Sequence, residues 1–146
     1  MTCLFCSIVA GDAPAEVVLD DPGVVGFLDV RPVFKGHVLL VPRQHVDTLL
    51  DLPDAQVKPL FATTRRVASG VTRAFDAQGT FVAMNNVVSQ SVPHLHVHVV
   101  PRTKGDGLRG FFWPRTTYDD AADAAAHADR LRAALEDTDP DDEGES

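Results

Sequence analysis

Residues 94–99 alternate histidine with apolar residues, in the order His-Leu-His-Val-His-Val. In an extended strand successive side chains point to opposite faces, so His94, His96 and His98 share one face. The three aliphatic side chains share the other face and can pack against a core, which makes this segment a half-buried strand of a sheet. Three imidazoles in a row are poorly explained by packing alone. They indicate a metal site or phosphoryl chemistry, because imidazole serves both as a metal ligand and as a nucleophile.

Four further strands and two helices are predicted around this segment. The strands are expected at 17–19, 24–28, 37–41 and 80–85, with the histidine strand over 94–100 as the fifth. Residues 20–23 read Asp-Asp-Pro-Gly, which predicts a turn that joins the first two strands in a hairpin. Apolar residues recur at helical spacing from 57 to 75, and Pro59 predicts that this helix starts near Lys58 or kinks there. The Ala-rich stretch 119–135 is expected to be helical. We therefore expect an α+β fold, an antiparallel five-stranded sheet with one long helix packed on it and a C-terminal helix.

Length and charge predict a single domain followed by an acidic tail. A chain of 146 residues corresponds to about one domain, which we place at 1–135. The net charge is −8, but residues 136–146 hold seven acids and no base, leaving 14 acidic against 13 basic residues elsewhere. We expect 136–146 to be disordered and the chain to have no general affinity for nucleic acid. With no signal-peptide run and no apolar stretch of membrane-spanning length, a cytoplasmic protein that does not enter membranes is expected.

Cys3 and Cys6 are the two cysteines and form a Cys-x-x-Cys pair. A thioredoxin-like redox motif follows a strand, and no strand fits before residue 3. A disulfide is disfavoured in a reducing compartment. A zinc site needs two more ligands, for which five histidines are available, namely His37, His45, His94, His96 and His98. His127 falls in the predicted C-terminal helix and is expected at the surface. Zinc is the favoured interpretation.

The residues that flank the histidine strand favour a phosphate ligand. Ser89, Gln90 and Ser91 precede it and supply hydroxyl, amide and backbone N–H donors. Basic residues follow it within a short segment, at Arg102, Lys104, Arg109 and Arg115. Arginine pairs with phosphate through two parallel hydrogen bonds, so the pattern indicates an anionic substrate.

The segment 89–102, Ser-Gln-Ser-Val-Pro-His-Leu-His-Val-His-Val-Val-Pro-Arg, resembles the signature of the histidine triad family of nucleotide hydrolases and transferases. The resemblance runs from Cys3 to about Arg115 and includes 29–32 (Asp-Val-Arg-Pro) and 36–42 (Gly-His-Val-Leu-Leu-Val-Pro). Members that begin with this Cys pair carry a structural zinc, and the resemblance selects its four ligands. They are Cys3, Cys6, His45 and His94.

The resemblance also assigns the remaining site residues. His96 becomes the nucleophile, and His98 helps to hold the bound phosphate by hydrogen bonding. The residues expected to bind nucleotide are Asp29 (ribose hydroxyls), His37 (beside the nucleoside), Asn85, Ser89, Gln90, Ser91 and His98. Ser89 stands where the family commonly has glycine, which allows a closer backbone approach to phosphate. Phe5, Ile8 and Leu28 are candidate walls for the base, and each would serve equally well in a core.

The expected activity is cleavage at the α-phosphate through a nucleotidyl-His96 intermediate that water opens. The basic and aromatic segment 104–115 favours dinucleoside polyphosphates as substrates, with release of a nucleoside monophosphate. The alternatives are a nucleoside phosphoramidate hydrolase, a transferase with the same first half-reaction, and a non-catalytic nucleotide-binding regulatory module. By resemblance the chain is expected to form a homodimer through the helix and an edge strand.

Overall fold

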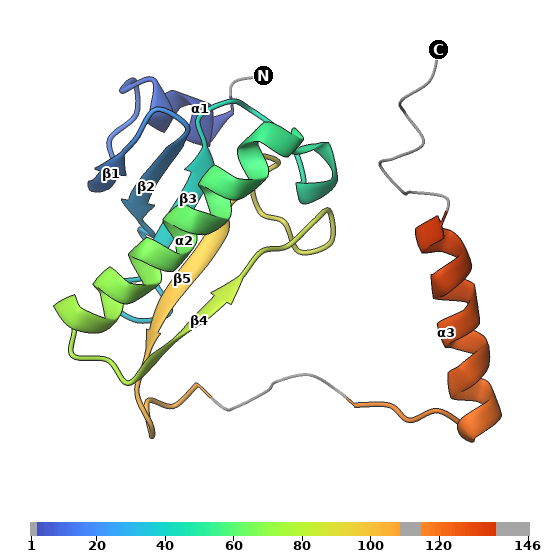
Figure 1. Cartoon of the computed structure of the whole chain (residues 1–146). Coiled ribbons are helices and arrows are strands. Elements are labelled where there is room, and N and C mark those ends of the chain that lie inside the picture. The colour runs from blue at the N-terminus through green and yellow to red at the C-terminus, as the bar shows by residue number, and fades with distance from the viewer. Residues whose placement is uncertain (1–2, 109–114, 137–146) are drawn as a thin grey trace, which may run out of the picture. The chain divides into compact units, whose positions relative to one another are not determined.

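The computed structural model describes residues 3–108 and 115–136, and the chain divides into two units, Met1–Gly107 and Leu108–Ser146. The first unit contains a five-stranded antiparallel sheet in the order β1-β2-β3-β5-β4 (Figure 1). The strands are β1 (Val17–Asp20), β2 (Val24–Leu28), β3 (Val38–Pro42), β4 (Gly79–Ala83) and β5 (Val97–Arg102). The antiparallel five-stranded sheet expected from the sequence is therefore confirmed.

The sheet is apolar on both faces, and each face has its own core. Strand side chains alternate between faces, so neighbouring residues of one strand fall into different cores. One core combines β2, β3 and β5 residues with helix α2, and its buried members include Val24, Val38, Leu40, Leu60, Val71, Val97 and Val99. The other core consists of Phe5, Val25, Phe27, Leu39 and Val41.

The long helix α2 (Asp54–Ala74) covers the first of these faces (Figure 1). Its buried residues Leu60, Thr64 and Val71 recur at helical spacing and pack on the sheet. Of the two alternatives predicted at Lys58, a helix start is wrong, because the helix begins at Asp54, directly after Pro53, and a kink stays a prediction. Pro59 lies inside the helix but is exposed, so water can hydrate the carbonyl group that its missing N–H leaves without a partner.

Three local features differ from the prediction. A short helix α1 (Leu4–Val9) was not predicted, and it packs Phe5 against the second face of the sheet. A 3₁₀ turn η1 (Leu49–Asp51) precedes α2. The predicted start of the last strand at His94 is also wrong: β5 begins at Val97, because the backbone N–H of Leu95 donates to the carbonyl of Val46 instead of to a neighbouring strand (2.8 Å).

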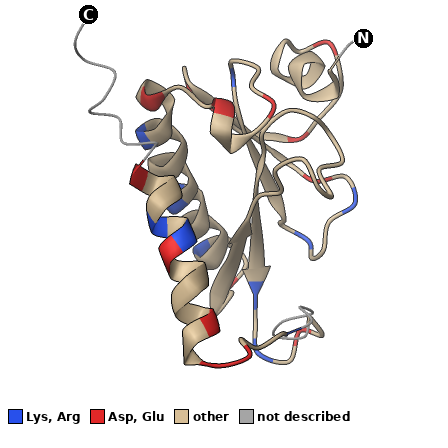
Figure 2. Ribbon diagram, turned by 90° about the vertical axis from the view of Figure 1, so that its right-hand side faces the viewer, with Lys and Arg blue, Asp and Glu red and all other residues tan. Residues whose placement is uncertain are grey.

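The described part of the second unit contains helix α3 (Ala121–Glu136), which confirms the predicted C-terminal helix. Within its own unit α3 buries no residue, and it carries charges of both signs (Figure 2). Glu136, predicted to begin the tail, is the last residue of α3, and 137–146 lie outside the described residues. A single domain over 1–135 stays a prediction. No helix within the described ranges is long and apolar enough to span a membrane.

Candidate functional site

The triad histidines gather on the sheet face opposite α2, together with His37 and His45. His98 lies directly across from Leu39 in the β3–β5 ladder, and directly paired residues share a face. Leu39 belongs to the core that contains Phe5. The ring of His96 meets the ring of Phe5 nearly edge to face, with centroids 5.1 Å apart. Helix α1 therefore forms one wall beside the second histidine of the triad.

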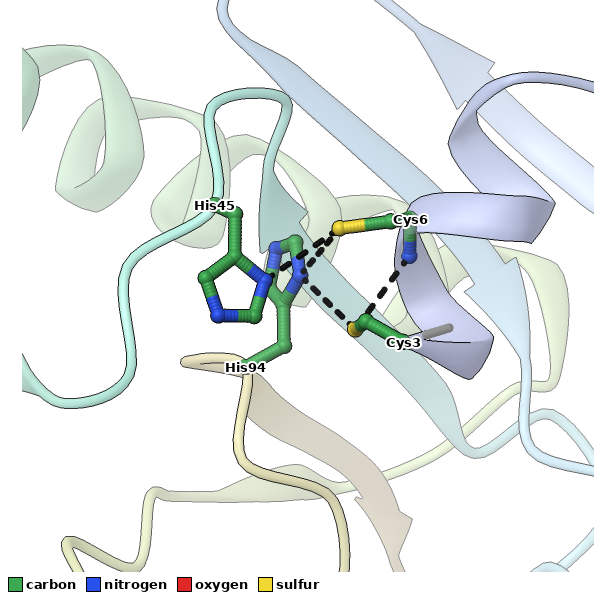
Figure 3. A group of neighbouring side chains, drawn as sticks. All are labelled: Cys3, Cys6, His45 and His94. Carbon is green, nitrogen blue, oxygen red and sulfur yellow. Dashed lines mark hydrogen bonds between the residues drawn. The ribbon is translucent and has the colours of Figure 1, made fainter. Parts of the chain in front are cut away.

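Four side chains from three distant segments meet at the start of α1 (Figure 3). They are Cys3, Cys6, His45 and His94, and their ligand atoms all lie within 4.8 Å of one another. His94 Nδ1 is 3.5 Å from the sulfur atoms of both Cys3 and Cys6, and His45 Nδ1 is 3.2 Å from the sulfur of Cys6. Tetrahedral zinc with ordinary bond lengths places nitrogen and sulfur ligands about 3.6 Å apart. The four residues thus fit a tetrahedral metal site of the Cys₂His₂ type.

The outer hydrogen bonds of the two imidazoles fix which nitrogen faces the cysteines. His94 Nε2 lies 2.9 Å from the carbonyl oxygen of Pro42, and because a carbonyl only accepts, Nε2 carries the proton. His45 Nε2 likewise donates to the carboxylate of Asp47 at 2.7 Å. Each ring therefore turns the lone pair of Nδ1 toward the cysteines. This is the arrangement in which carbonyl or carboxylate partners orient metal-ligating histidines.

The direction of the pKa shift differs among the four residues of the cluster. Burial lowers the pKa of His94 and favours the neutral ring that a metal requires. The hydrogen bond to Asp47 raises the pKa of His45. Burial works against ionisation of Cys3, but hydrogen bonds, chiefly from the backbone of Cys6, outweigh it and lower the pKa of Cys3. Burial and the adjacent Cys3 raise the pKa of Cys6. Ionisation therefore starts at Cys3.

His96 is held with its Nε2 atom available for chemistry. Its Nδ1 atom lies 2.8 Å from the carbonyl oxygen of His94 and donates to it, so the lone pair of the neutral ring is on Nε2. The side chain is only 3% exposed. A fixed tautomer with a free lone pair is what a nucleophilic imidazole needs.

A chain of hydrogen bonds orients His98. The backbone N–H of Val33 donates to His37 Nδ1 at 3.1 Å, so the proton of His37 lies on Nε2. His37 Nε2 donates to His98 Nδ1 at 2.9 Å, which leaves His98 with an N–H at Nε2. Burial, assisted by His96 and His37, lowers the pKa of His98 to about 4. At neutral pH His98 is thus an uncharged hydrogen-bond donor.

Asp29 stands next to this pair. Its Oδ1 atom accepts the backbone N–H of Arg31 at 2.9 Å, and its Oδ2 atom lies 3.8 Å from His37 Nδ1. The structure thus brings together Asp29, His37 and His98, all predicted from the sequence to bind nucleotide. One carboxylate oxygen remains to accept hydrogen bonds from a ligand, in keeping with the predicted contact to ribose hydroxyls.

The loop 85–91 was predicted to contact phosphate, but two of its side-chain amides donate hydrogen bonds to protein carbonyl groups. Asn85 Nδ2 donates to the carbonyl of Ser89 at 3.2 Å, and Gln90 Nε2 donates to the carbonyl of Asp47 at 2.6 Å. Ser91 is exposed. Ser89 has φ of +61°, in the left-handed region that glycine adopts without strain. The backbone of serine is therefore strained at the position where the family commonly has glycine.

Two residues that organise the site were missed by the sequence analysis. Asp47 holds His45, and their i, i+2 spacing beside a candidate ligand was the available signal. Asn86 Oδ1 accepts the backbone N–H of Leu49 at 2.8 Å, a long-range contact with no local signal. Leu28, a candidate wall of the base pocket, instead packs with the α2 core on the other face.

The basic residues after the triad are only partly described. Arg102 Nε donates to the carboxylate of Asp106 at 2.7 Å, at the end of β5 that is farthest from His96. Lys104 is exposed, and so is Arg115 in the second unit. Residues 109–114, with Arg109 among them, lie outside the described residues. Arg102 is therefore engaged with protein rather than free for phosphate.

Comparisons with known proteins agree with this geometry. The chain is 38% identical to "Protein hit" of Bacillus subtilis over 81% of its own length and 82% of the relative. It is 31% identical to adenosine 5'-monophosphoramidase hnt1 of Schizosaccharomyces pombe, covering 78% and 84% of the two chains. A Zn-bound histidine triad family protein from Mycobacterium smegmatis matches with a TM-score of 0.71 and 36% identity, over 92% and 98% of the chains. The family model for the HIT domain matches residues 10–105, and the chain belongs to this histidine triad family.

Proposed function

We propose that this chain, a nucleotide hydrolase of the histidine triad type, hydrolyses nucleoside 5'-phosphoramidates through a covalent nucleotidyl-His96 intermediate. The observation that carries the proposal is the hydrogen bond from His96 Nδ1 to the carbonyl of His94 (2.8 Å), which leaves the Nε2 lone pair free. The relative named adenosine 5'-monophosphoramidase supports this choice of leaving group.

The reaction has two displacement steps. The Nε2 atom of His96 attacks the α-phosphorus and forms a nitrogen–phosphorus bond, while the bond to the leaving amine breaks with its electron pair. The amine takes up a proton from solvent and departs. Water then attacks the same phosphorus and gives up a proton to solvent, while the bond to Nε2 breaks and its electron pair returns to the imidazole, so that a nucleoside monophosphate and His96 are released. The N–H of His98, with Ser91, stabilises the negative charge on the phosphate oxygens.

We also propose that the Cys3–Cys6–His45–His94 cluster holds a structural zinc ion. The support is the match of the interatomic distances to a tetrahedral site and the Nδ1 orientation of both rings. Such an ion supplies folding free energy by joining α1 to the segments around His45 and His94. All four positions are protein ligands, so the chemistry falls to His96 and its neighbours.

Dinucleoside polyphosphates are the second candidate substrate class, with attack at the same α-phosphorus. The basic and aromatic composition of 104–115 favours it. We place it second because a relative that shares 31% identity with this chain is named an adenosine 5'-monophosphoramidase. A purely regulatory nucleotide-binding module would not need a nucleophile held in one tautomer, so catalysis is the better supported function.

Side-by-side turnover of adenosine 5'-phosphoramidate and diadenosine tetraphosphate tests the proposal, with His96→Asn as the matched control. The expected result is faster release of AMP from the phosphoramidate, with ¹⁸O from labelled water on the AMP phosphate. Rapid quenching should trap nucleotide covalently on the wild type and not on the variant. Faster turnover of the tetraphosphate to AMP and ATP would favour the second substrate class. Unchanged turnover by His96→Asn would refute the mechanism.

The homodimer stays a proposal supported by exposed apolar side chains on the predicted elements. Val57 and Phe61 of α2 are 39% and 46% exposed, and Val82 of the edge strand β4 is 45% exposed. Exposed apolar groups on a helix and on a sheet edge are features of subunit interfaces. Sedimentation equilibrium should give a dimer for the wild type and a monomer for Phe61→Asp.

A further inference from the structure

Residues 45–49, here called the linking segment, contact three parts of the site at once. His45 faces the sulfur of Cys6 in the metal cluster at 3.2 Å. The carbonyl of Val46 accepts the backbone N–H of Leu95, between the first two histidines of the triad, at 2.8 Å. The carbonyl of Asp47 accepts from Gln90 at 2.6 Å. A shift of this short segment would therefore reach the metal cluster, the triad and the loop 85–91 together.

Gln90 has both ends of its side-chain amide engaged within the protein. Nε2 donates to the carbonyl of Asp47, and Oε1 accepts the backbone N–H of Val87 at 2.9 Å. Asn86 adds a second connection, because its Oδ1 atom accepts the N–H of Leu49 at 2.8 Å. The loop is thus attached to the linking segment at two points that are separate in sequence.

The loop needs such restraints because its backbone is strained. Val87 and Ser89 have φ of +71° and +61°, in the left-handed region that L side chains rarely adopt. Val87 is β-branched, which makes this conformation more costly still. Strained backbone of this kind persists where surrounding contacts over-determine it. The bonds made by Gln90 and Asn86 are contacts of that kind.

Asp47 joins the two ends of the connection in one residue. Its carboxylate holds Nε2 of His45 at 2.7 Å, and its main-chain carbonyl holds Gln90. When His45 is fixed as a ligand, Asp47 is fixed with it and presents its carbonyl to Gln90. Because coupling between sites is reciprocal, loss of the Gln90 contact must in turn weaken metal binding.

We infer that Gln90 is a positioning residue whose side chain couples the loop 85–91 to the metal cluster through Asp47, and not primarily a contact to substrate phosphate. The inference rests on the metal site proposed above. Binding of the metal would then have a second effect besides stabilising the fold, because it favours the ordered form of the loop 85–91. Removal of the metal should disorder the loop before the unit unfolds.

Cobalt titration of the full-length chain tests the coupling. Co²⁺ bound by cysteine sulfur gives absorption bands, so its dissociation constant can be measured directly for the wild type, Gln90→Met and Ser91→Ala. We expect Gln90→Met to bind Co²⁺ about tenfold more weakly, the lower end of the range for residues outside the ligand set. Ser91→Ala changes an exposed hydroxyl of the same loop and should bind Co²⁺ like the wild type.

The cobalt titration distinguishes the positioning role of Gln90 from the proposed metal site and from the proposed phosphoramidase activity. Equal Co²⁺ affinity for Gln90→Met and the wild type, with turnover reduced, would make Gln90 a direct substrate contact and overturn the inference. A wild type without cobalt–thiolate bands would overturn the metal site, and the inference with it. Failure of the phosphoramidase assay would leave the metal measurement unaffected.

Hydrogen exchange supplies an independent readout that does not depend on Gln90→Met folding well. The backbone N–H groups of Val87 and Leu49 donate to Gln90 and Asn86, so they report the two connections. Stripping the metal from the wild type should speed exchange at both amides, and Asn86→Ala should weaken Co²⁺ binding in the same direction as Gln90→Met. If the exchange rates of the Leu49 and Val87 amides do not change when the metal is removed, the coupling is refuted.

Discussion

Acid should destabilise the first unit through His98. Its pKa is lowered from 6.5 to about 4, mainly by burial. The unfolded chain therefore binds this proton at a higher pH than the folded chain does, so protonation favours unfolding. The contribution of neutral His98 to stability is fully present above pH 6.5 and is lost progressively as the pH falls from 6.5 toward 4.

The magnitude follows from the size of the shift. One pKa unit corresponds to about 1.4 kcal/mol, so a lowering from 6.5 to about 4 is worth at most about 3 kcal/mol. Most of this stabilisation is lost before the pH falls to 4. We expect the free energy of unfolding to decrease by about 2 kcal/mol between pH 7 and pH 5. Burial lowers the pKa of His37 as well, and its protonation acts in the same direction.

Urea unfolding at pH 7, 6 and 5 tests this expectation, with His98→Asn as the control. Asparagine does not titrate, and its Oδ1 atom can still accept the N–H of His37 Nε2. Protonation of the cysteines and loss of metal affect both proteins alike, so the difference between their slopes isolates His98. The wild type should lose about 2 kcal/mol more than the variant. Parallel slopes would refute the assignment of His98 as a half-buried neutral donor.

Four further substitutions have definite expected outcomes. His96→Ala should abolish turnover but retain zinc, whereas His94→Ala should lose zinc, and elemental analysis can measure the zinc content of both. Zinc lost in His96→Ala but kept in His94→Ala would contradict the roles proposed for the two histidines. Gly36 has φ of +99° and an added Cβ would collide with the ring of Phe75, so Gly36→Ala should cost about 1–3 kcal/mol in urea unfolding. Val87 is 74% exposed with φ of +71°, so Val87→Gly should stabilise the protein by about 1 kcal/mol in thermal unfolding; a lowered melting temperature would contradict this.

The sheet could be predicted from the sequence because a period of two is a local signal. The hairpin of β1 and β2 follows from apolar runs on either side of an Asp-Asp-Pro-Gly turn, and the long helix follows from a period of 3.6. The short helix α1 was missed because its six residues are too few to display a period. The boundary of β5 was misplaced because the Leu95 N–H bonds to Val46, far away in the sequence.

The site was less predictable, because the side chains that organise it are joined by tertiary contacts. Gln90 and Asp47 are 43 residues apart, and Asn86 and Leu49 are 37 apart. No spacing rule relates such pairs. The sequence placed Gln90 beside the triad and assigned it to phosphate, whereas its amide is engaged with protein. The four members of the metal cluster came from the family resemblance, and the Cys pair alone left two of its partners open.

The three triad histidines differ in chemistry because different partners occupy their ring nitrogens. The carbonyl of Pro42 takes the N–H at Nε2 of His94 and turns Nδ1 toward the cysteines. The carbonyl of His94 accepts the N–H at Nδ1 of His96 and leaves the lone pair of Nε2 free. His37 donates to Nδ1 of His98, which keeps the proton of His98 on Nε2. The proposed metal ligand, the proposed nucleophile and a hydrogen-bond donor thus arise from one residue type. Since the carbonyl of His94 accepts the N–H of His96, the backbone that places the proposed metal ligand also sets the tautomer of the proposed nucleophile.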